Sequence, residues 1–332
     1  MKPDPQVSII IPAYNAAKTI AETLDSVFAQ TFSDFEIILI NDGSTDETAA
    51  IVQRYDDPRL LMFHYTNGGL ATARNRGIQK AKGRYLIFLD ADDLWTPNKL
   101  ETHVNALVQA ERENPKAAVV YSWSYFLDHQ TQQCFHDRSV SHQGHVLREI
   151  LQHNFITSGS NLMVSRAAVE ATGDFCQDFE GAADWHYWIR LAKQWDYVLV
   201  PERQVFYRQH ATSMSSSVVK MEREQKMALE DQCLSLPSDW QAIKNIGLSN
   251  IYFYSAKLYA RRSPTAETLA QFKHNLGKAL RLNPKLLLQR EFYLLGLKVM
   301  GLSLLPQRRF EQLRSYYRQL KRPQLNPQSI ES

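Results

Sequence analysis

The first hundred residues alternate between short apolar runs and segments of helical periodicity. Four continuous runs, rich in β-branched residues, are typical of strands buried on both faces of a sheet. They span residues 7–12, 36–41, 60–64 and 84–90. The helices predicted between them span residues 16–30, 44–55 and 70–82. This alternation with short connections predicts an α/β fold, a doubly wound, mostly parallel sheet flanked by helices.

Three local signals suggest where these elements begin and end. Pro12 is expected to end the first strand, because proline cannot donate a backbone hydrogen bond. The tetrapeptide Ser44-Thr45-Asp46-Glu47 has the form of a capping box and is expected to open a helix that runs through Tyr55. Gly83 is expected to end the third helix.

After residue 96 the pattern becomes mixed. Helices are expected over residues 97–110 and 184–195, and strands over residues 117–127 and 197–201. The polar segment 128–145 predicts a hairpin or loop.

A serine-rich stretch at residues 213–217 is the best candidate for a domain boundary. We therefore expect a first, α/β domain over residues 1–215, with halves 1–110 and 111–215. Residues 216–332 are expected to form a C-terminal α-helical extension, with helical periodicity to about residue 320.

Composition narrows the class of protein. The chain has 332 residues and a net charge of +3, which argues against a dedicated nucleic-acid-binding protein. Cys134, Cys176 and Cys233 are sparse and far apart, which excludes a disulfide framework and suits a cytoplasmic location. The first apolar run is too short for a signal peptide, and no uncharged apolar stretch reaches the roughly 18 residues of a transmembrane helix.

Asp90, Asp92 and Asp93 directly follow the fourth predicted strand. Three carboxylates in four positions repel one another unless a cation lies among them. Carboxylate oxygens suit Mg²⁺ or Mn²⁺, bound together with a substrate's phosphates. Ligands of open α/β sheets bind beyond the carboxyl ends of the strands, where this cluster is expected. The alternative is an acidic turn that caps the helix beginning near Pro97.

Two other predicted strands end in polar or aromatic residues that should lie on the same edge of the sheet. Asp42 offers hydrogen-bond acceptors to a base or ribose, and Tyr14 offers an aromatic face to a nucleobase. A turn with a helix cap remains the alternative for Asp42, and ordinary packing remains the alternative for Tyr14.

Four segments resemble the family 2 glycosyltransferases in order and spacing. They are VSIIIPAYNAAKTIAETLDSV, NDGSTDET, GGLATARNRGI and YLIFLDADDLWTPNKL. The resemblance is tight over residues 7–110 and looser to about residue 215. It implies an inverting enzyme of GT-A fold that uses a nucleoside-diphosphate sugar. A hexosyltransferase in polysaccharide, glycolipid or other glycoconjugate biosynthesis is therefore expected.

The resemblance implies roles for the matching residues. Those implied in nucleotide-sugar binding are Pro12, Tyr14, Asn15, Asp42, Arg74, Asp90, Ala91 and Asp92. Within this set, Asp42 would hydrogen-bond the base, and Arg74 would lie near the base or the diphosphate. A solvent-facing helix position is the alternative for Arg74. Asp92 would coordinate Mg²⁺ or Mn²⁺, and Asp90 would contact the ribose or support the metal through water. His210 is a candidate metal or phosphate ligand, with a structural or solvated role as the alternative, and Asp93 is expected to be structural.

The resemblance also implies a catalytic base at the start of the aromatic helix. Asp184 matches the aspartate of the family's Glu-Asp pair, and Ala183 stands where the glutamate is usual. A helix cap is the alternative for Asp184. Asp178 and Glu180 are nearby fallback bases.

The implied partners are a donor, most simply a UDP-sugar, and a glycan or lipid-linked acceptor; no nucleic acid is expected. Trp123, Trp185 and Trp188 are candidates to stack on sugar rings, although we expect two of the three to be core residues.

Three other classes of protein are alternatives to a glycosyltransferase. A Rossmann dehydrogenase needs a glycine-rich turn after the first strand, which the segment 7–19 lacks. A phosphatase with a nucleophilic aspartate would have its motif after the first strand rather than the fourth. A non-catalytic, glycosyltransferase-like protein that binds sugars or nucleotides is the remaining alternative, to which Ala183 lends slight support.

The charge is unevenly distributed along the chain. Residues 281–332 contain ten Lys or Arg and three Glu, a net +7, whereas the remaining 280 residues carry −4. A basic, apolar helix can lie at a membrane surface, so residues 281–322 predict a peripheral contact with the inner face of the membrane. The alternative is a helical pair that packs on the catalytic domain with a solvated basic face.

Overall fold

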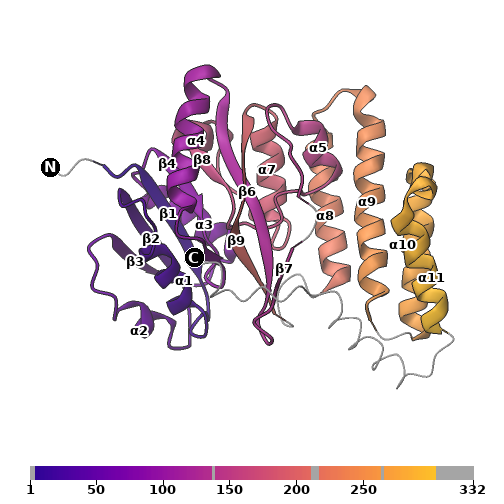
Figure 1. Cartoon of the computed structure of the whole chain (residues 1–332), viewed down its shortest axis with the longest axis horizontal. Coiled ribbons are helices and arrows are strands. Elements are labelled where there is room, and N and C mark those ends of the chain that lie inside the picture. The colour runs from indigo at the N-terminus through magenta and orange to yellow at the C-terminus, as the bar shows by residue number, and fades with distance from the viewer. Residues whose placement is uncertain (1–3, 137–138, 211–216, 263–264, 304–332) are drawn as a thin grey trace. The chain divides into compact units, whose positions relative to one another are not determined.

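A computed structural model describes residues 4–136, 139–210, 217–262 and 265–303 of the chain (Figure 1). The chain divides into two compact units. The first includes the described residues up to Leu147 together with Phe155–His210. The second includes Arg148–Asn154 and the described residues from Ser217 onward. Residues 213–216 of the predicted boundary, and the helix predicted beyond residue 303, lie outside the described residues.

The first unit is a mixed β-sheet with helices on both faces. Its strands are β1 (Val7–Ala13), β2 (Phe35–Asp42), β3 (Leu60–Tyr65), β4 (Tyr85–Phe88), β5 (Leu94–Trp95), β6 (Ala117–Asp128), β7 (Cys134–Phe135), β8 (Met163–Ser165) and β9 (Asp196–Gln209). Its helices are α1 (Ile20–Phe28), α2 (Thr48–Val52), α3 (Leu70–Lys80), α4 (Lys99–Glu113), α6 (Arg166–Thr172) and α7 (Ala183–Ala192). The predicted α/β class is confirmed.

The strand order is β3-β2-β1-β4-β8-β6-β9-β5, and β7 pairs with β6. The four strands predicted in the first hundred residues form the parallel half of the sheet. Beyond it, β8 lies antiparallel between β4 and β6, and β6 and β9 are parallel. The predicted strand at residues 197–201 is the first part of a longer strand, β9.

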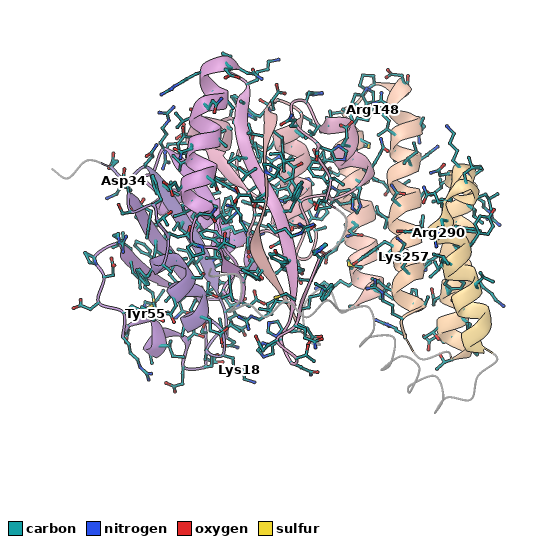
Figure 2. All side chains as sticks on the ribbon, viewed as in Figure 1. Lys18, Asp34, Tyr55, Arg148, Lys257 and Arg290 are labelled. Atoms are coloured by element: carbon teal, nitrogen blue, oxygen red, sulfur yellow. The ribbon has the colours of Figure 1, made fainter. Side chains whose placement is uncertain are left out.

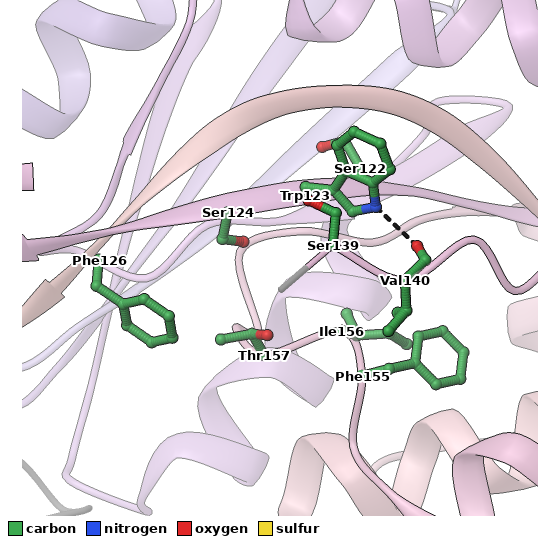
Figure 3. A pocket seen from close by; sticks show the side chains of 9 residues that line it. All are labelled: Ser122, Trp123, Ser124, Phe126, Ser139, Val140, Phe155, Ile156 and Thr157. Atoms are coloured by element: carbon green, nitrogen blue, oxygen red, sulfur yellow. Dashed lines mark hydrogen bonds between the residues drawn. The ribbon is translucent and has the colours of Figure 1, made fainter. Parts of the chain in front are cut away.

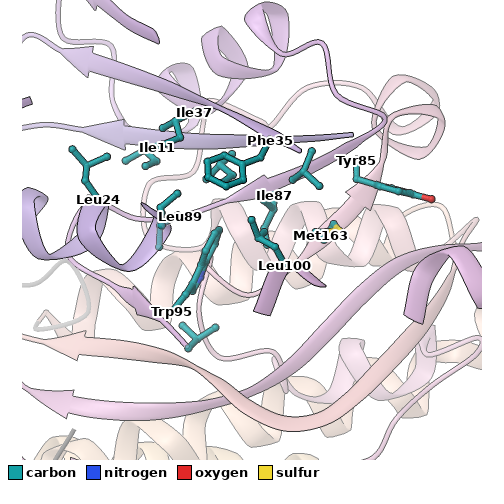
Figure 4. Packing of buried hydrophobic residues seen from close by; sticks show 14 of the residues in the cluster. Ile11, Leu24, Phe35, Ile37, Tyr85, Ile87, Leu89, Trp95, Leu100 and Met163 are labelled. Carbon is teal, nitrogen blue, oxygen red and sulfur yellow. The ribbon is translucent and has the colours of Figure 1, made fainter. Parts of the chain in front are cut away.

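One face of the sheet carries a hydrophobic core. Alternate residues of β1, β2 and β4 pack there against α1 and α4, as the cluster around Ile11, Ile37, Ile87 and Leu100 shows (Figure 4). On the other face α3 approaches β1 so closely that a Cβ on Gly77 would lie 2.3 Å from a methyl carbon of Ile10. Side chains fill the spaces between these elements (Figure 2).

Pro12 does not end β1, which continues to Ala13. The carbonyl of Ile10 accepts a hydrogen bond from the amide of Leu89, so Ile10 bonds toward β4. Because bonding directions alternate along a parallel strand, Pro12 also faces that side. The β1–β4 register ends at Ile10 and Phe88, so the missing N–H of Pro12 leaves no ladder bond unmade.

The predicted capping box is wrong. α2 begins at Thr48, and its N-cap residue, Glu47, makes no side-chain capping bond. The Ser44 hydroxyl instead accepts the backbone N–H of Asn15 at 3.0 Å. Asp46 accepts both the amide and the hydroxyl of Thr48. These side chains tie together loops that follow two strands, which shortens the helix.

Gly83 does not cap α3 in the left-handed conformation. The helix ends at Lys80, and Ala81 is already extended. A Cβ on Gly83 would lie 2.5 Å from the backbone nitrogen of Ser8. The glycine is therefore needed for the close approach of this loop to β1.

The described part of the second unit is helical. It contains α8 (Val218–Cys233), η2 (Ser238–Trp240), α9 (Gln241–Tyr259), α10 (Ala266–Leu282), η3 (Pro284–Leu288) and α11 (Arg290–Ser303), together with all of α5 (Leu147–Gln152) except its first residue. A core that includes Phe253, Phe272, Ala279, Leu286 and Leu295 joins α9, α10, η3 and α11. The predicted helical C-terminal region is thus present. No described helix is both long enough and apolar enough to cross a membrane.

Candidate functional site

The candidate residues of the parallel half meet at one edge of the sheet. β1 lies between β2 and β4, and all three run in the same direction. Tyr14, Asp42 and Asp90 lie at or just beyond their carboxyl ends and therefore along a common edge, as the sequence predicted.

The loop after β1 combines an exposed aromatic side chain with a fixed turn. Tyr14 is 54% exposed. Asn15 has a positive φ of 50°, and its side-chain oxygen accepts the backbone N–H of Thr45 at 2.8 Å. Tyr14 is thus available to a ligand, whereas the carbonyl oxygen of the Asn15 amide already joins the loops after β1 and β2.

Asp42 is buried, and protein donors surround its carboxylate. The backbone amides of Gly68 and Gly69 donate to it at 2.9–3.1 Å. The Arg76 guanidinium forms an ion pair with it at 2.6 Å and lies over the ring of Tyr65. A base that hydrogen-bonds to Asp42 must therefore share or replace one of these donors.

Arg74 and Asp90 form a buried ion pair. The guanidinium of Arg74, whose side chain is 2% exposed, donates to Asp90 Oδ1 at 2.7 Å. Its Nε has no hydrogen-bond acceptor among the described residues. Gly159 makes room for the pair, because a Cβ there would lie 2.3 Å from an Arg74 nitrogen. The predicted solvent-facing alternative for Arg74 is wrong.

Asp184 lies in the first turn of α7, within the electrostatic influence of this ion pair. Burial raises the pKa of Asp184, and the Asp90 carboxylate raises it further, while the charge of Arg74 and a hydrogen bond from the Trp185 amide oppose the rise. Its Oδ1 accepts the N–H of Trp185 at 2.6 Å. Ala183 is fully buried.

The two fallback bases have different surroundings. Asp178 and Glu180 are exposed, whereas Asp184 is half-buried beside Arg74 and Asp90. The structure thus brings Asp184 into the electrostatic neighbourhood of the Arg74–Asp90 pair.

Asp92 points to a histidine near the end of β9. Its Oδ2 lies 3.3 Å from His210 Nε2, and its side chain is 39% exposed. Burial of the remainder and the nearby Asp90 carboxylate raise the pKa of Asp92 to about 6, although the charge of Arg208 lowers it. The rings of His210 and His129 lie 4.3 Å apart between centroids.

The third aspartate is enclosed by protein. Asp93 is fully buried and accepts the hydroxyls of Ser158 and Ser160, at 2.9 and 2.5 Å, and the backbone N–H of Arg208. The Arg208 side chain donates to the Asp92 carbonyl and pairs with Glu22. Asp93 therefore joins the strand ends to β9, in line with the structural role expected for it.

A second buried network lies around Lys99. Its ammonium is fully buried and donates to the Ser122 hydroxyl and to both oxygens of Asn161, and it lies 3.1 Å from His103 Nε2. Burial holds the pKa of Lys99 well below its ordinary value. Burial, and then the charge of Lys99, does the same for His103.

A small cavity adjoins this network (Figure 3). The Trp123 indole lines it and donates to the carbonyl of Val140 at 2.7 Å. Ser124 and Thr157 add hydroxyls, and Thr157 has a positive φ of 75°, which is strained for a β-branched residue. At about 30 Å³ the cavity has room for water but not for a sugar.

The three tryptophans fall into two groups. Trp185 and Trp188 are buried in the core, where the Trp188 ring lies against Phe88 and Phe175. Trp123 is half-buried at the cavity. Of the three candidates for sugar stacking, Trp123 is the one outside the core, but the cavity that it lines is too small for a sugar and Arg203 lies over its ring.

Sequence reasoning missed three cations. Arg76 pairs with Asp42, Arg208 anchors β9, and Lys99 lies in the buried network. The spacing of Arg74 and Arg76, and the position of Arg208 two residues before His210, were available signals. Lys99 gave none, because a lysine in the first turn of a helix usually faces solvent.

The geometry agrees with comparisons to known proteins. The family model described as glycosyl transferase family 2 matches residues 8–173, half of the chain. The chain belongs to this family. The uncharacterized glycosyltransferase RT0329 of Rickettsia typhi is 33% identical over 193 residues, which are 57% of this chain and 59% of that protein. This family 2 chain thus spans less than two thirds of that relative.

Solved structures show the same fold. S. aureus TarS 1-349 in complex with UDP-GlcNAc has a TM-score of 0.64 and 18% identity, covering 95% of this chain and 92% of that one. The mannosyltransferase PcManGT from Pyrobaculum calidifontis, in complex with GDP-Man and Mn²⁺, has a TM-score of 0.56 and 17% identity, covering 90% and 88%. The likeness identifies the fold of this family 2 chain as the GT-A type.

The donor atoms at the strand ends fit a divalent cation only in part. Among the described residues, no three His, Cys, Asp or Glu side chains form a group that could hold a metal alone. Asp92 and His210 bring a carboxylate and an imidazole together, while Asp90 is held by Arg74. The Asp92 carboxylate suits Mg²⁺ or Mn²⁺, which take further oxygen ligands from substrate phosphates and water, whereas the imidazole is not a ligand that Mg²⁺ prefers.

Proposed function

We propose that this protein transfers a sugar from a nucleoside-diphosphate sugar to an acceptor hydroxyl, with inversion at the anomeric carbon. The observation that supports it best is the grouping of Asp184, Arg74 and Asp90 beside Asp92 and His210. A base, a buried guanidinium and a partial metal site are the parts that such a transfer requires.

The donor would bind along the carboxyl edge of the parallel strands. Tyr14 offers its face to the base, and Asp42 offers acceptors once a donor such as Arg76 moves aside. Arg74 Nε is a buried N–H donor without a protein acceptor among the described residues, which suits an oxygen of the diphosphate. We infer a UDP-sugar donor, since TarS binds UDP-GlcNAc on the same fold.

Asp184 would act as the catalytic base. It accepts the proton of the acceptor hydroxyl as that oxygen attacks the anomeric carbon. The new glycosidic C–O bond forms while the bond to the diphosphate breaks, and its electron pair leaves with the nucleoside diphosphate. One displacement inverts the anomeric centre. Burial favours this role, because the raised pKa of Asp184 strengthens it as a base while Arg74 opposes the rise.

Asp92 and His210 would hold Mg²⁺ or Mn²⁺, with Asp90 positioned by Arg74 nearby. A divalent cation supplies charge neutralisation for the leaving diphosphate. The residues themselves present a carboxylate and an imidazole 3.3 Å apart, and the carboxylate is opposite in charge to Arg74. The acceptor would be a glycan or a lipid-linked sugar.

A panel of nucleotide sugars tests the proposal. We expect nucleoside-diphosphate release with one donor class and a rise in the rate when an acceptor sugar is added, both lost in excess chelator. Product stereochemistry, read by nuclear magnetic resonance, checks inversion. Tight donor binding with no release from any donor would instead support the non-catalytic alternative, for which Ala183 in place of the usual glutamate is the motivating observation.

A further inference from the structure

The second unit carries a cluster of exposed apolar side chains. Eleven large hydrophobic residues are exposed among the described residues, and five of them fall within the short segment 287–297. They are Leu287, Leu288, Tyr293, Leu294 and Leu297, which we call the 287–297 patch. Leu288 is 85% exposed and Leu297 is 63% exposed. Single exposed leucines are ordinary, but this density is not.

α11 is apolar on two sides. Phe292, Leu295 and Val299, spaced three and four residues apart, pack into the helical core. Tyr293, Leu294 and Leu297, also spaced three and four apart, are exposed. A helix with apolar residues all round is normally covered all round. The exposed side therefore calls for an occupant.

The charges around the patch indicate which occupant. Lys285 precedes it and Arg290 lies within it, and both are exposed (Figure 2 labels Arg290). Glu291, the acidic residue of the segment 281–303, is paired with Lys257 at 2.6 Å. Positive charge beside exposed leucines and a tyrosine matches a bilayer surface that contains anionic lipids.

We propose that the 287–297 patch docks this protein on an anionic membrane surface, with the leucines in the headgroup–acyl boundary and Lys285 and Arg290 at the lipid headgroups. The proposal does not depend on sugar transfer, because membrane binding is measured without substrate. It would also bring a glycosyltransferase to lipid-linked acceptors.

Vesicle flotation of the full chain tests the docking. We expect the protein to float with vesicles of equal parts phosphatidylcholine and phosphatidylglycerol, and to stay at the bottom with phosphatidylcholine alone. The double change Lys285→Glu and Arg290→Glu should weaken binding at least about twentyfold, since each basic residue contributes about fivefold. The double change Leu294→Ser and Leu297→Ser should weaken it more than about tenfold.

Leu234→Ser is the matched control, because Leu234 is 81% exposed at the end of another helix, α8. It should float like the unchanged protein. Circular dichroism should show that all variants remain helical. The proposal is overturned if the protein does not float with anionic vesicles, or if the patch variants float as well as the control. A dimer seen by sedimentation, lost in the leucine variant and unaffected by vesicles, would assign the patch to a second copy instead.

Discussion

Two groups of polar residues in the first unit differ in how exposed they are and in which hydrogen-bond partners they have. The strand-end group consists of Asp90, Asp92, Asp184 and His210. The buried polar group consists of Asp93, Lys99, His103, Ser122 and Asn161. Members of the buried polar group are fully or almost fully buried, and all of them make hydrogen bonds within the protein, although His103 Nδ1 has no hydrogen-bond partner among the described residues. In the strand-end group, Asp92 and Asp184 are only half-buried, and Arg74 beside them keeps an unused N–H among the described residues.

The difference teaches that burial and shifted pKa values do not by themselves indicate a reactive site. Both groups contain a carboxyl whose pKa is raised by burial, Asp93 in one and Asp184 in the other. Asp93 is enclosed by serine hydroxyls and a backbone amide, which fixes its position. Asp184 retains exposed surface. Retained exposure beside the unused N–H of Arg74, more than burial, marks Asp184 as the candidate for chemistry.

The largest effect is expected for Asp184→Asn. An asparagine keeps the shape but cannot accept the acceptor's proton, so the transfer rate should fall about 10²–10⁴-fold. Binding of the nucleotide donor should persist, as measured by calorimetry. Asp178→Asn and Glu180→Gln, both on exposed residues, serve as controls and should retain transfer. Near-normal turnover in Asp184→Asn would exclude it as the base.

Next in size is the effect of Asp93→Ala on stability. The change leaves Ser158, Ser160 and the Arg208 amide without their common acceptor, and should lower the free energy of unfolding by about 2 kcal/mol. Urea denaturation measures it. Asp57→Ala, which breaks a partly exposed pair with Arg59, should cost less than about 1 kcal/mol. An equal loss of unfolding free energy in the two variants would mean that the hydrogen bonds of Asp93 stabilise the fold no more than the partly exposed Asp57–Arg59 pair does.

The contrast between the two groups also shows which features of the site can be predicted from the sequence. Continuous apolar runs predicted the parallel strands, and parallel strands put Asp42 and Asp90 on one edge whatever their partners are. The sequence could not supply the partners. Arg76 reaches Asp42 across 34 positions and Arg208 reaches Asp93 across 115, separations that only the folded chain closes.

Local signals failed where tertiary contacts competed for the same side chain. Ser44 lies in a segment with the sequence of a helix cap, but its hydroxyl accepts a hydrogen bond from the backbone N–H of Asn15 in another loop. Gly83 has the position of a helix-ending glycine, but close approach to Ser8 is what excludes a side chain there. The buried position of Lys99 could not be predicted for the same reason, because its hydrogen-bond partners lie on β6 and in the chain before β8.

A smaller effect on the transfer rate is expected for Gly159→Ala, which places a new Cβ against the Arg74–Asp90 pair. The new Cβ would lie 2.3 Å from an Arg74 nitrogen and 3.2 Å from Asp90 Oδ2, so the ion pair must shift. Transfer should fall about tenfold, as a small displacement of positioning groups does. Gly277→Ala is the control, because a Cβ there meets nothing within 4 Å and α10 tolerates alanine. Unchanged transfer in Gly159→Ala would separate the Arg74–Asp90 pair from catalysis.

The smallest effect tests whether the buried polar group is inert, through Lys99→Met. Because burial lowers the pKa of Lys99 in the folded state below the 10.5 of a free lysine, the unfolded chain binds more protons between these two pKa values. The free energy of unfolding should therefore rise with pH there, by up to about 1.4 kcal/mol per pH unit from this residue. Asn161 Oδ1 still accepts hydrogen bonds from Ser122 in the variant, so the fold should persist while this slope disappears.

Denaturation at neutral and alkaline pH measures the slope of the free energy of unfolding against pH. Lys116→Met, at an exposed lysine, is the control that should keep the slope. An unchanged slope in Lys99→Met would mean that the ammonium stays charged in the folded protein.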